Sequence, residues 1–176
     1  MADKINSRSK GSKNEREVSK LFETWTGFPF TRVPSSGGLG WKTSNSVGDI
    51  ICTDEKHSRF FSFAIEAKFY KEIKFEHLIN GNKNSDIIKF WEQSTRDANQ
   101  VNKMPLVTMR YNGMKKNLHF IIIQTPYLEY LDIKTPSGKL SYSKDYNFTI
   151  ISSVDWFNTE YKIIHKQTKK YLKLYV

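Results

Sequence analysis

Residues Val47–Lys71, VGDIICTDEKHSRFFSFAIEAKFYK, contain two apolar runs with charged side chains at their ends. Short runs rich in Ile and Phe and bounded by polar residues predict two adjacent β-strands, at 48–53 and 59–68. Successive side chains of a strand point to opposite faces, so Glu66 and Lys68 are expected on the same face of the second strand. Burying such charges costs free energy unless they are paired or bound to a metal, so we expect them to serve a function.

Asp49 lies at the start of the first strand and adds a second acid to Glu66 and Lys68. Carboxylates are hard oxygen ligands, and Mg²⁺ or Mn²⁺ is commonly held by one or two of them together with a substrate phosphate. The sequence therefore predicts a divalent-metal site, with a lysine beside it, at one end of an apolar sheet. Other acid-x-lysine tripeptides, such as Glu72–Lys74, lie in polar stretches without an upstream acid of this kind.

A periodic set of apolar residues predicts an amphipathic helix over residues 12–25. The set consists of Val18, Leu21, Phe22 and Trp25. Glu15 precedes this apolar stripe and can project toward the sheet end that carries Asp49. Ser12 and Glu15 also match a capping box, which would give Glu15 a purely structural role.

A first strand is predicted at 28–33, with Arg32 near its end, and a loop rich in Gly and Ser follows. The glycines let the backbone come close to a bulky ligand, and the hydroxyls of Ser35 and Ser36 can bond phosphate oxygens. Lys42 adds positive charge to the same segment. A hairpin loop without function would have the same composition.

The rest of the chain gives weaker signals. The predicted segments are a helix at 85–100, strands at 105–111, 118–124 and 148–152, a short helix at 154–162 and a basic tail at 161–176. We expect one α/β domain of residues 1–176, in which residues 1–10 are flexible. Residues 126–176 form an elaboration that could extend the sheet or cover its edge.

The chain is basic, with 28 Lys and Arg against 18 Asp and Glu and a net charge of +10. Such a balance favours a polyanionic partner, because each neutralised phosphate releases counterions. The single cysteine, Cys52, cannot form an intramolecular disulfide and fits a reducing compartment such as the cytoplasm. No apolar run is long enough to span a membrane, and no Walker motif implies a nucleotide cofactor.

Four segments together resemble the PD-(D/E)XK nuclease superfamily, and within it the archaeal-type Holliday-junction resolvases and their phage-borne relatives. In chain order the segments are KGSKNERE at 10–17, Arg32 with SSGG at 35–38, GDII at 48–51 and IEAK at 65–68. Gly48 stands where the superfamily's name has proline. The resemblance implies a restriction-endonuclease-like core, in which helices flank a central mixed β-sheet.

The resemblance also implies an active-site set and a metal-dependent mechanism. The set is Glu15, Asp49, Glu66 and Lys68. Asp49, Glu66 and the backbone carbonyl of Ala67 would hold Mg²⁺, for which Mn²⁺ could substitute, and Glu15 would bind the ion directly or through water. The candidate DNA contacts are Lys10, Lys13, Arg16, Arg32, Ser35, Ser36 and Lys42. A four-way junction needs two symmetric nicks, which implies a homodimer.

Two other functions stay open on the sequence. The same site could cut ordinary duplex DNA, as in a restriction-like or homing-like endonuclease. Alternatively, the chain could be a basic DNA-binding or packaging protein without catalytic activity, which would leave Asp49, Glu66 and Lys68 unexplained.

Overall fold

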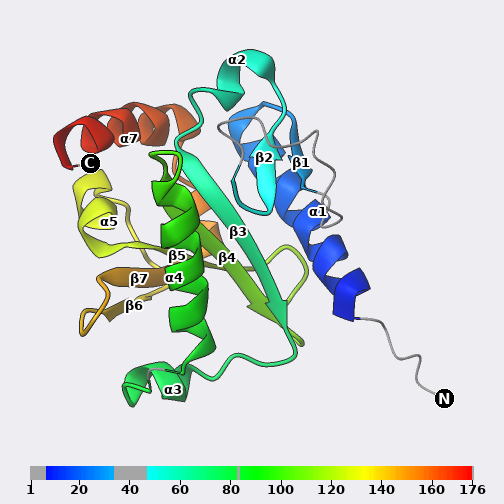
Figure 1. Ribbon diagram of the computed structural model, residues 1–176, viewed down its shortest axis with the longest axis vertical. Helices are drawn as coiled ribbons and strands as arrows, with labels where there is room; N and C mark the ends of the chain where they lie inside the picture. The colour runs from blue at the N-terminus through cyan, green and yellow to red at the C-terminus, as the bar shows by residue number, and fades with distance from the viewer. Residues whose placement is uncertain (1–6, 34–46, 83, 176) are drawn as a thin grey trace.

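A computed structural model of the protein describes residues 7–33, 47–82 and 84–175, and its centre is a mixed β-sheet (Figure 1). Seven strands follow the order β1-β2-β3-β4-β5-β7-β6 across this sheet. Only β3 and β4 are parallel, and the other neighbours are antiparallel. The strands are β1 (Phe30–Arg32), β2 (Ile50–Cys52), β3 (Phe63–Tyr70), β4 (Met104–Tyr111), β5 (Phe120–Gln124), β6 (Lys139–Tyr142) and β7 (Phe148–Ser152).

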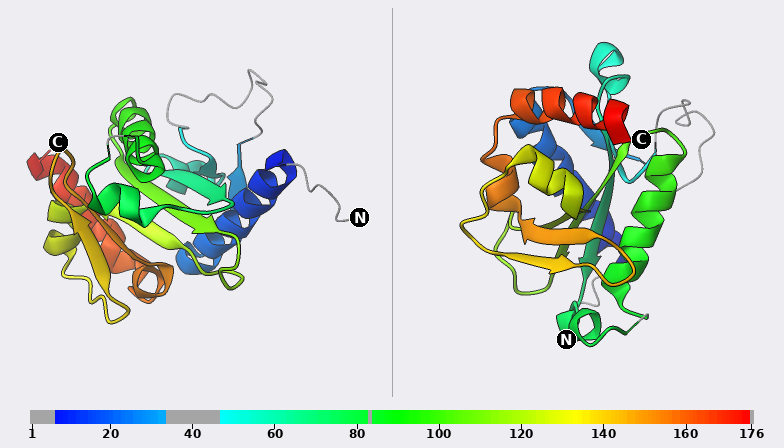
Figure 2. Two further views of the ribbon diagram at one scale, coloured as in Figure 1. Left: turned by 90° about the horizontal axis from the view of Figure 1, so that it is seen from below. Right: turned by 90° about the vertical axis from the view of Figure 1, so that its left-hand side faces the viewer.

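Helices cover both faces of the sheet. They are α1 (Ser7–Thr26), α2 (Glu55–Ser58), α3 (Phe75–Ile79), α4 (Asp86–Asn99), α5 (Thr125–Leu131), α6 (Ser153–Phe157) and α7 (Tyr161–Tyr175). Figure 2 (right) shows α4 on one side of the sheet and α1, α5, α6 and α7 on the other. This arrangement confirms the expected α/β architecture, a mixed sheet flanked by helices.

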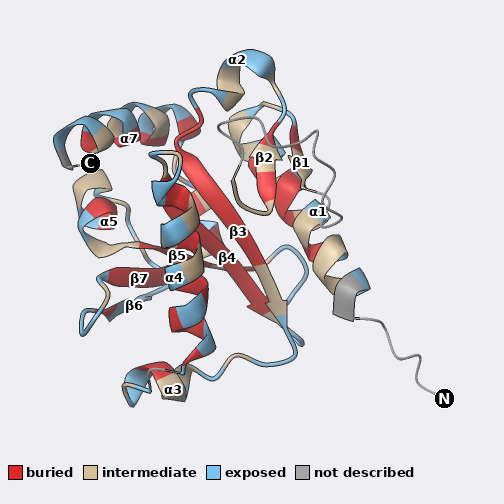
Figure 3. Ribbon diagram, in the orientation of Figure 1, coloured by how far each residue is buried: buried red, intermediate tan, exposed pale blue. Residues whose placement is uncertain are grey.

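The two central strands, β3 and β4, are buried along most of their length (Figure 3). One face of β3 places Phe63, Ile65 and Ala67 in a core shared with Val18 and Phe22 of α1. The opposite face of the sheet packs on α4 through a second apolar cluster. The predicted alternation of apolar side chains along β3 is therefore confirmed.

Several predicted segments differ from the structure near the N-terminus. The helix α1 spans Ser7–Thr26, so residues 7–10 are helical, whereas the sequence predicted a helix only from residue 12. Because Ser12 and Glu15 lie inside this helix, they do not form a capping box at its start. The expected turn after β2 contains the short helix α2, whose first N–H groups bond the carboxylate of Asp54.

The C-terminal third is more regular than its sequence suggested. Strands β7 and β6 extend the sheet beyond β5, and the expected basic tail is the helix α7. Its buried residues recur with helical spacing at Tyr161, Ile164, Thr168 and Tyr171, whereas the lysines point outward. In the described part of the chain, no helix combines the length and the apolar character needed to cross a bilayer.

Candidate active site

The candidate site forms where β2 diverges from β3, next to the pair Ile50 and Ile65, and we call this point the fork. The two strands are antiparallel and pair at Ile50 and Ile65, so residue 49 comes opposite residue 66. Beyond this pair, β3 continues to Tyr70 without β2 beside it, and among the described residues no strand pairs with this part of β3 on the side away from β4, which we call its open edge. The N–H of Asp49 donates to the carbonyl of Ile65 at 2.8 Å, which fixes the start of β2 against β3.

Gly48 explains how the chain comes so close to β3. Its φ of +90° is a conformation that side chains rarely adopt, and a Cβ there would lie 2.5 Å from the carbonyl oxygen of Ile65. Proline has a fixed negative φ and cannot take this conformation. The glycine in place of the superfamily's proline is therefore required by the backbone geometry of this chain.

Asp49 turns its carboxylate to the open edge of β3. Its Oδ2 accepts a hydrogen bond from the N–H of Ala67 at 2.9 Å, which satisfies a donor that β2 leaves unpaired. The same carboxylate lies beside that of Glu66, which raises the pKa of Glu66. Two of the predicted acids are thus brought together at this point.

Glu66 is buried at the sheet surface, with 3% of its side chain exposed. Desolvation and the neighbouring Asp49 carboxylate raise its pKa to about 7, although the Lys68 ammonium opposes this shift. Burial alone would lower the pKa of Lys68, but the carboxylates of Glu66 and Asp49 more than offset this and raise it. Lys68 is therefore held in its charged form.

Gln93 of α4 completes this cluster. Lys68 Nζ donates to Glu66 Oε2 at 2.8 Å and to Gln93 Oε1 at 3.0 Å. The amide nitrogen of Gln93 in turn donates to Glu66 Oε2 at 3.1 Å. This residue could not be predicted from the sequence, because a glutamine inside an amphipathic helix carries no signal of its own. Only the packing of α4 on β3 places it over the acid and the lysine.

Glu15 forms an ion pair with an arginine of β1. Its Oε2 lies 3.2 Å from Nη1 of Arg32, and both side chains are mostly buried. Arg32 pairs with Ile50 in the β1–β2 ladder, next to Asp49. The structure thus places Glu15 and Arg32 at the α1 side of the fork, with Glu15 bonded to Arg32.

The candidate DNA-contact residues divide into two groups. Lys13 and Arg16 are exposed on α1, Lys10 is half-buried at its start, and Arg32 lies in the fork as described. Ser35, Ser36 and Lys42 lie outside the described residues.

The donor set was tested against the divalent ion that the resemblance implies. Among residues 7–33, 47–82 and 84–175, no three His, Cys, Asp or Glu side chains form a group that could hold a metal ion by themselves. The adjacent carboxylates of Asp49 and Glu66 nevertheless fit Mg²⁺ or Mn²⁺, which need only one or two carboxylates in addition to substrate phosphate and water. Their mutual repulsion would be relieved by a bound cation.

The mixed sheet, its helical layers and the acid–lysine cluster of Asp49, Glu66 and Lys68 are the features expected of the PD-(D/E)XK class. Comparison with known families agrees, since the chain belongs to the family described as phage putative PDDEXK endonuclease, which matches residues 6–173. The chain is also similar to Protein D14 of Escherichia phage T5, with 27% identity over 106 residues. This match covers 60% of the chain and 65% of that relative, which is less than two thirds of its length. No solved structure matches the chain.

Proposed function

We propose that this nuclease is a divalent-metal-dependent DNA endonuclease that hydrolyses phosphodiester bonds in branched DNA, with the Holliday junction as its substrate. The observation that carries the proposal is the pair of carboxylates of Asp49 and Glu66 at the edge of β3, where Glu66 accepts a hydrogen bond from Lys68 and Asp49 accepts one from the N–H of Ala67. Buried like charges of this kind are costly, and a cation that also binds a phosphate gives them a use.

In the proposed mechanism, Asp49, Glu66 and the carbonyl of Ala67 would hold Mg²⁺, and Mn²⁺ could take its place. Glu15 would contribute directly or through water, while its bond to Arg32 keeps that guanidinium next to the fork. When bound, such an ion polarises the scissile phosphate and lowers the pKa of a coordinated water.

The proposed role of Lys68 follows from the two hydrogen bonds that fix its ammonium group. Its side chain is 15% exposed, and its ammonium donates to both Glu66 and Gln93, so its position is fixed before substrate arrives. A preorganised cation of this kind stabilises negative charge that builds up on the phosphate during hydrolysis. We assign Lys68 to this task, or to orienting the attacking water.

Phosphate contacts would come from α1, from the fork and from the loop after β1. The residues proposed are Lys10, Lys13, Arg16, Arg32, Ser35, Ser36 and Lys42. The net charge of +10 supports this role, because phosphate neutralisation dominates DNA affinity.

The choice of branched DNA rests on the resemblance to junction resolvases at the N-terminal motifs. The two-fold symmetry of a four-way junction suits a homodimer, and we propose that state for the active enzyme. We also propose that residues 1–176 act as one nuclease domain, since strands β6 and β7 belong to the same sheet as β3. The host cytoplasm is the expected compartment for a phage-encoded enzyme of this kind.

A nicking assay tests the proposal. A synthetic four-way junction and a linear duplex with the same arms are incubated with the protein in Mg²⁺, in Mn²⁺ and in EDTA. We expect symmetric nicks in the junction with either metal, little cleavage of the duplex and none in EDTA. Equal cleavage of both substrates would favour the duplex endonuclease instead. DNA binding without metal-dependent nicking would leave only the non-catalytic alternative.

A further inference from the structure

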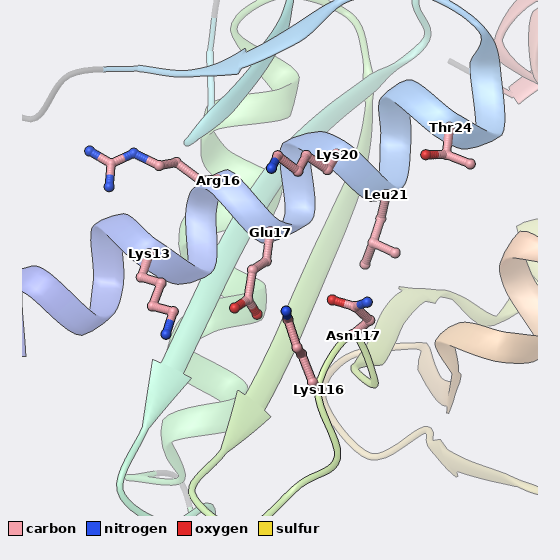
Figure 4. A pocket seen from close by; sticks show the side chains of 8 residues that line it. All are labelled: Lys13, Arg16, Glu17, Lys20, Leu21, Thr24, Lys116 and Asn117. Atoms are coloured by element: carbon pink, nitrogen blue, oxygen red, sulfur yellow. The ribbon is translucent and has the colours of Figure 1, made fainter.

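A groove of about 440 Å³ lies between α1 and the loop that joins β4 to β5. We refer to it as the α1–loop groove, and its polar lining is Lys13, Arg16, Glu17, Lys20, Thr24, Lys116 and Asn117. Figure 4 shows Lys13 and Glu17 pointing from the helix toward the loop, where Lys116 points back at the helix. The groove is open to solvent, and its four cationic side chains are exposed.

The groove has an excess of positive charge. Within the part of the chain that the structure describes, Lys13, Arg16, Lys20 and Lys116 form no ion pair. The single acid, Glu17, does not offset them, because its Oε2 is paired with Nη1 of Arg110 at 2.8 Å. Positive charge therefore exceeds negative charge along the groove, where Glu17 is the one acid of the lining, and this favours an anionic ligand.

Two buried contacts fix the shape of the groove. Arg110 bonds Glu17 of α1 with Nη1 and the carbonyl of Met114 in the loop with Nη2, at 3.2 Å. Closer to the start of the helix, Asn14 Oδ1 lies 3.2 Å from Nε2 of the buried His119. These contacts hold the helix and the loop in a fixed arrangement. A ligand would therefore bind a preformed surface, and little conformational entropy would be lost on binding.

The α1–loop groove and the acid–lysine cluster are on different sides of the sheet, since the groove is lined by α1 whereas Glu66 and Lys68 contact Gln93 of α4 on the opposite face. Figure 2 (left) shows this blue helix between β1 and β2 on one side and the green loop after β4 on the other. Glu15 faces the first side, where it bonds Arg32, and Glu17 faces the second, where it bonds Arg110.

We propose that the α1–loop groove binds the phosphate backbone of a second DNA segment, separate from the segment that is cut at Asp49 and Glu66. This inference rests on the proposed function, in that it assumes a branched DNA substrate. One DNA arm would lie at the fork between β2 and β3, and a second arm would be bound along α1. The protein would then bind most tightly to DNA whose two arms are oriented to reach both places. Lysine and arginine side chains suit contacts with the phosphate backbone of DNA, which do not depend on the base sequence.

The test compares DNA affinities of two double variants in EDTA, where cleavage cannot interfere. Lys13→Ala/Lys116→Ala removes two cations from the groove. Lys166→Ala/Lys170→Ala removes the same charge from the exposed side of α7 and serves as the matched control. Dissociation constants for the four-way junction and for a linear duplex of the same arms are measured over a series of salt concentrations. Thermal unfolding shows whether each variant stays folded.

We expect the groove variant to bind the junction about tenfold more weakly than the wild type, with a salt slope reduced by about two because two phosphate contacts are lost. Its affinity for the duplex should match that of the α7 control. An equal loss of affinity for junction and duplex, or no loss beyond the control, would overturn the proposal. Failure of the wild type to nick any DNA would instead refute the proposed function, and the binding comparison would still test the groove.

Discussion

The carboxylate of Asp49 accepts a hydrogen bond from the backbone N–H of Ala67 at 2.9 Å. This contact joins the segment before β2 to the edge of β3 at the point where the two strands separate. It also brings Asp49 beside Glu66, the residue that precedes Ala67. The Asp49 side chain therefore has two roles: it accepts a hydrogen bond from an N–H at the edge of β3, and it is one of the two carboxylates of the pair.

These two tasks can be separated by substitution. Asp49→Asn keeps an oxygen that can accept from Ala67 but removes the charge, so we expect no cleavage, normal DNA binding in EDTA and nearly normal stability. Asp49→Ala should also lose cleavage, and it should lower the free energy of unfolding by about 1–3 kcal/mol because a hydrogen bond to a charged group is lost. Nicking assays and urea unfolding measure both effects. Asp145→Asn, at an exposed site, is the control. Wild-type cleavage by Asp49→Asn would exclude this residue from the reaction.

The positive φ of Gly48 and its contact with Ile65 predict a second effect. Gly48→Ala should reduce stability and cleavage together, because a Cβ 2.5 Å from a backbone oxygen forces β2 away from β3. Gly138→Ala is a matched control, since Gly138 has a φ of +92° and nothing within 4 Å of an added Cβ. Strain in φ alone costs about 1–3 kcal/mol at either position. Urea unfolding should show a distinctly larger loss for Gly48→Ala, and equal losses would contradict this account of the fork.

Much of the central sheet could be predicted because its pattern is local. The apolar run through Phe63 and Ile65, and the periodicity around Val18 and Phe22, describe faces that the core requires. The C-terminal helix α7 was missed although its buried residues have helical spacing, since five lysines and several aromatic residues hid the amphipathic pattern. The short strand β6 has a single buried side chain, that of Tyr142, and gives almost no signal.

The site shows a similar limit. Asp49, Glu66 and Lys68 could be singled out because charges at the end of an apolar strand break a local rule. The hydrogen-bond partners of the candidate residues depend on how separate elements pack: Arg32 bonds Glu15, and Gln93 bonds Lys68. Such long-range pairs leave no periodic trace in the sequence, so only the three-dimensional fold reveals them.

The raised pKa of Glu66 predicts how stability depends on pH in EDTA. Its pKa is about 7 in the folded protein, against 4.5 as the ordinary value, so the folded state binds the proton more tightly. Stability should therefore fall as the pH rises from about 4.5 through 7, by an amount on the order of 3 kcal/mol. Glu66→Gln removes this dependence, so the variant should gain stability relative to wild type as the pH rises.

Urea unfolding at pH 5, 6, 7 and 8 measures this difference. Glu129→Gln, an exposed acid on α5, should follow the wild-type profile at every pH. If the gap between Glu66→Gln and wild type stays constant over this range, Glu66 does not titrate as its burial and its neighbour Asp49 require. Glu66→Gln should also abolish nicking, because it removes one carboxylate of the proposed metal site.

Gln93 provides the last prediction, since it contacts both Lys68 and Glu66. Gln93→Leu removes both hydrogen bonds and should lower kcat about 10- to 100-fold, as is usual for residues that orient a metal or catalytic ligand. Gln93→Glu can still accept from Lys68 but cannot donate to Glu66, and it adds a third carboxylate to the pair. We therefore expect Gln93→Glu to shift the pH–rate profile for junction nicking, which a purely structural defect would not do.

Gln100→Leu, at the exposed end of α4, should leave both readouts unchanged. Normal kcat and an unshifted profile in both Gln93 variants would mean that Lys68 keeps its position without this amide.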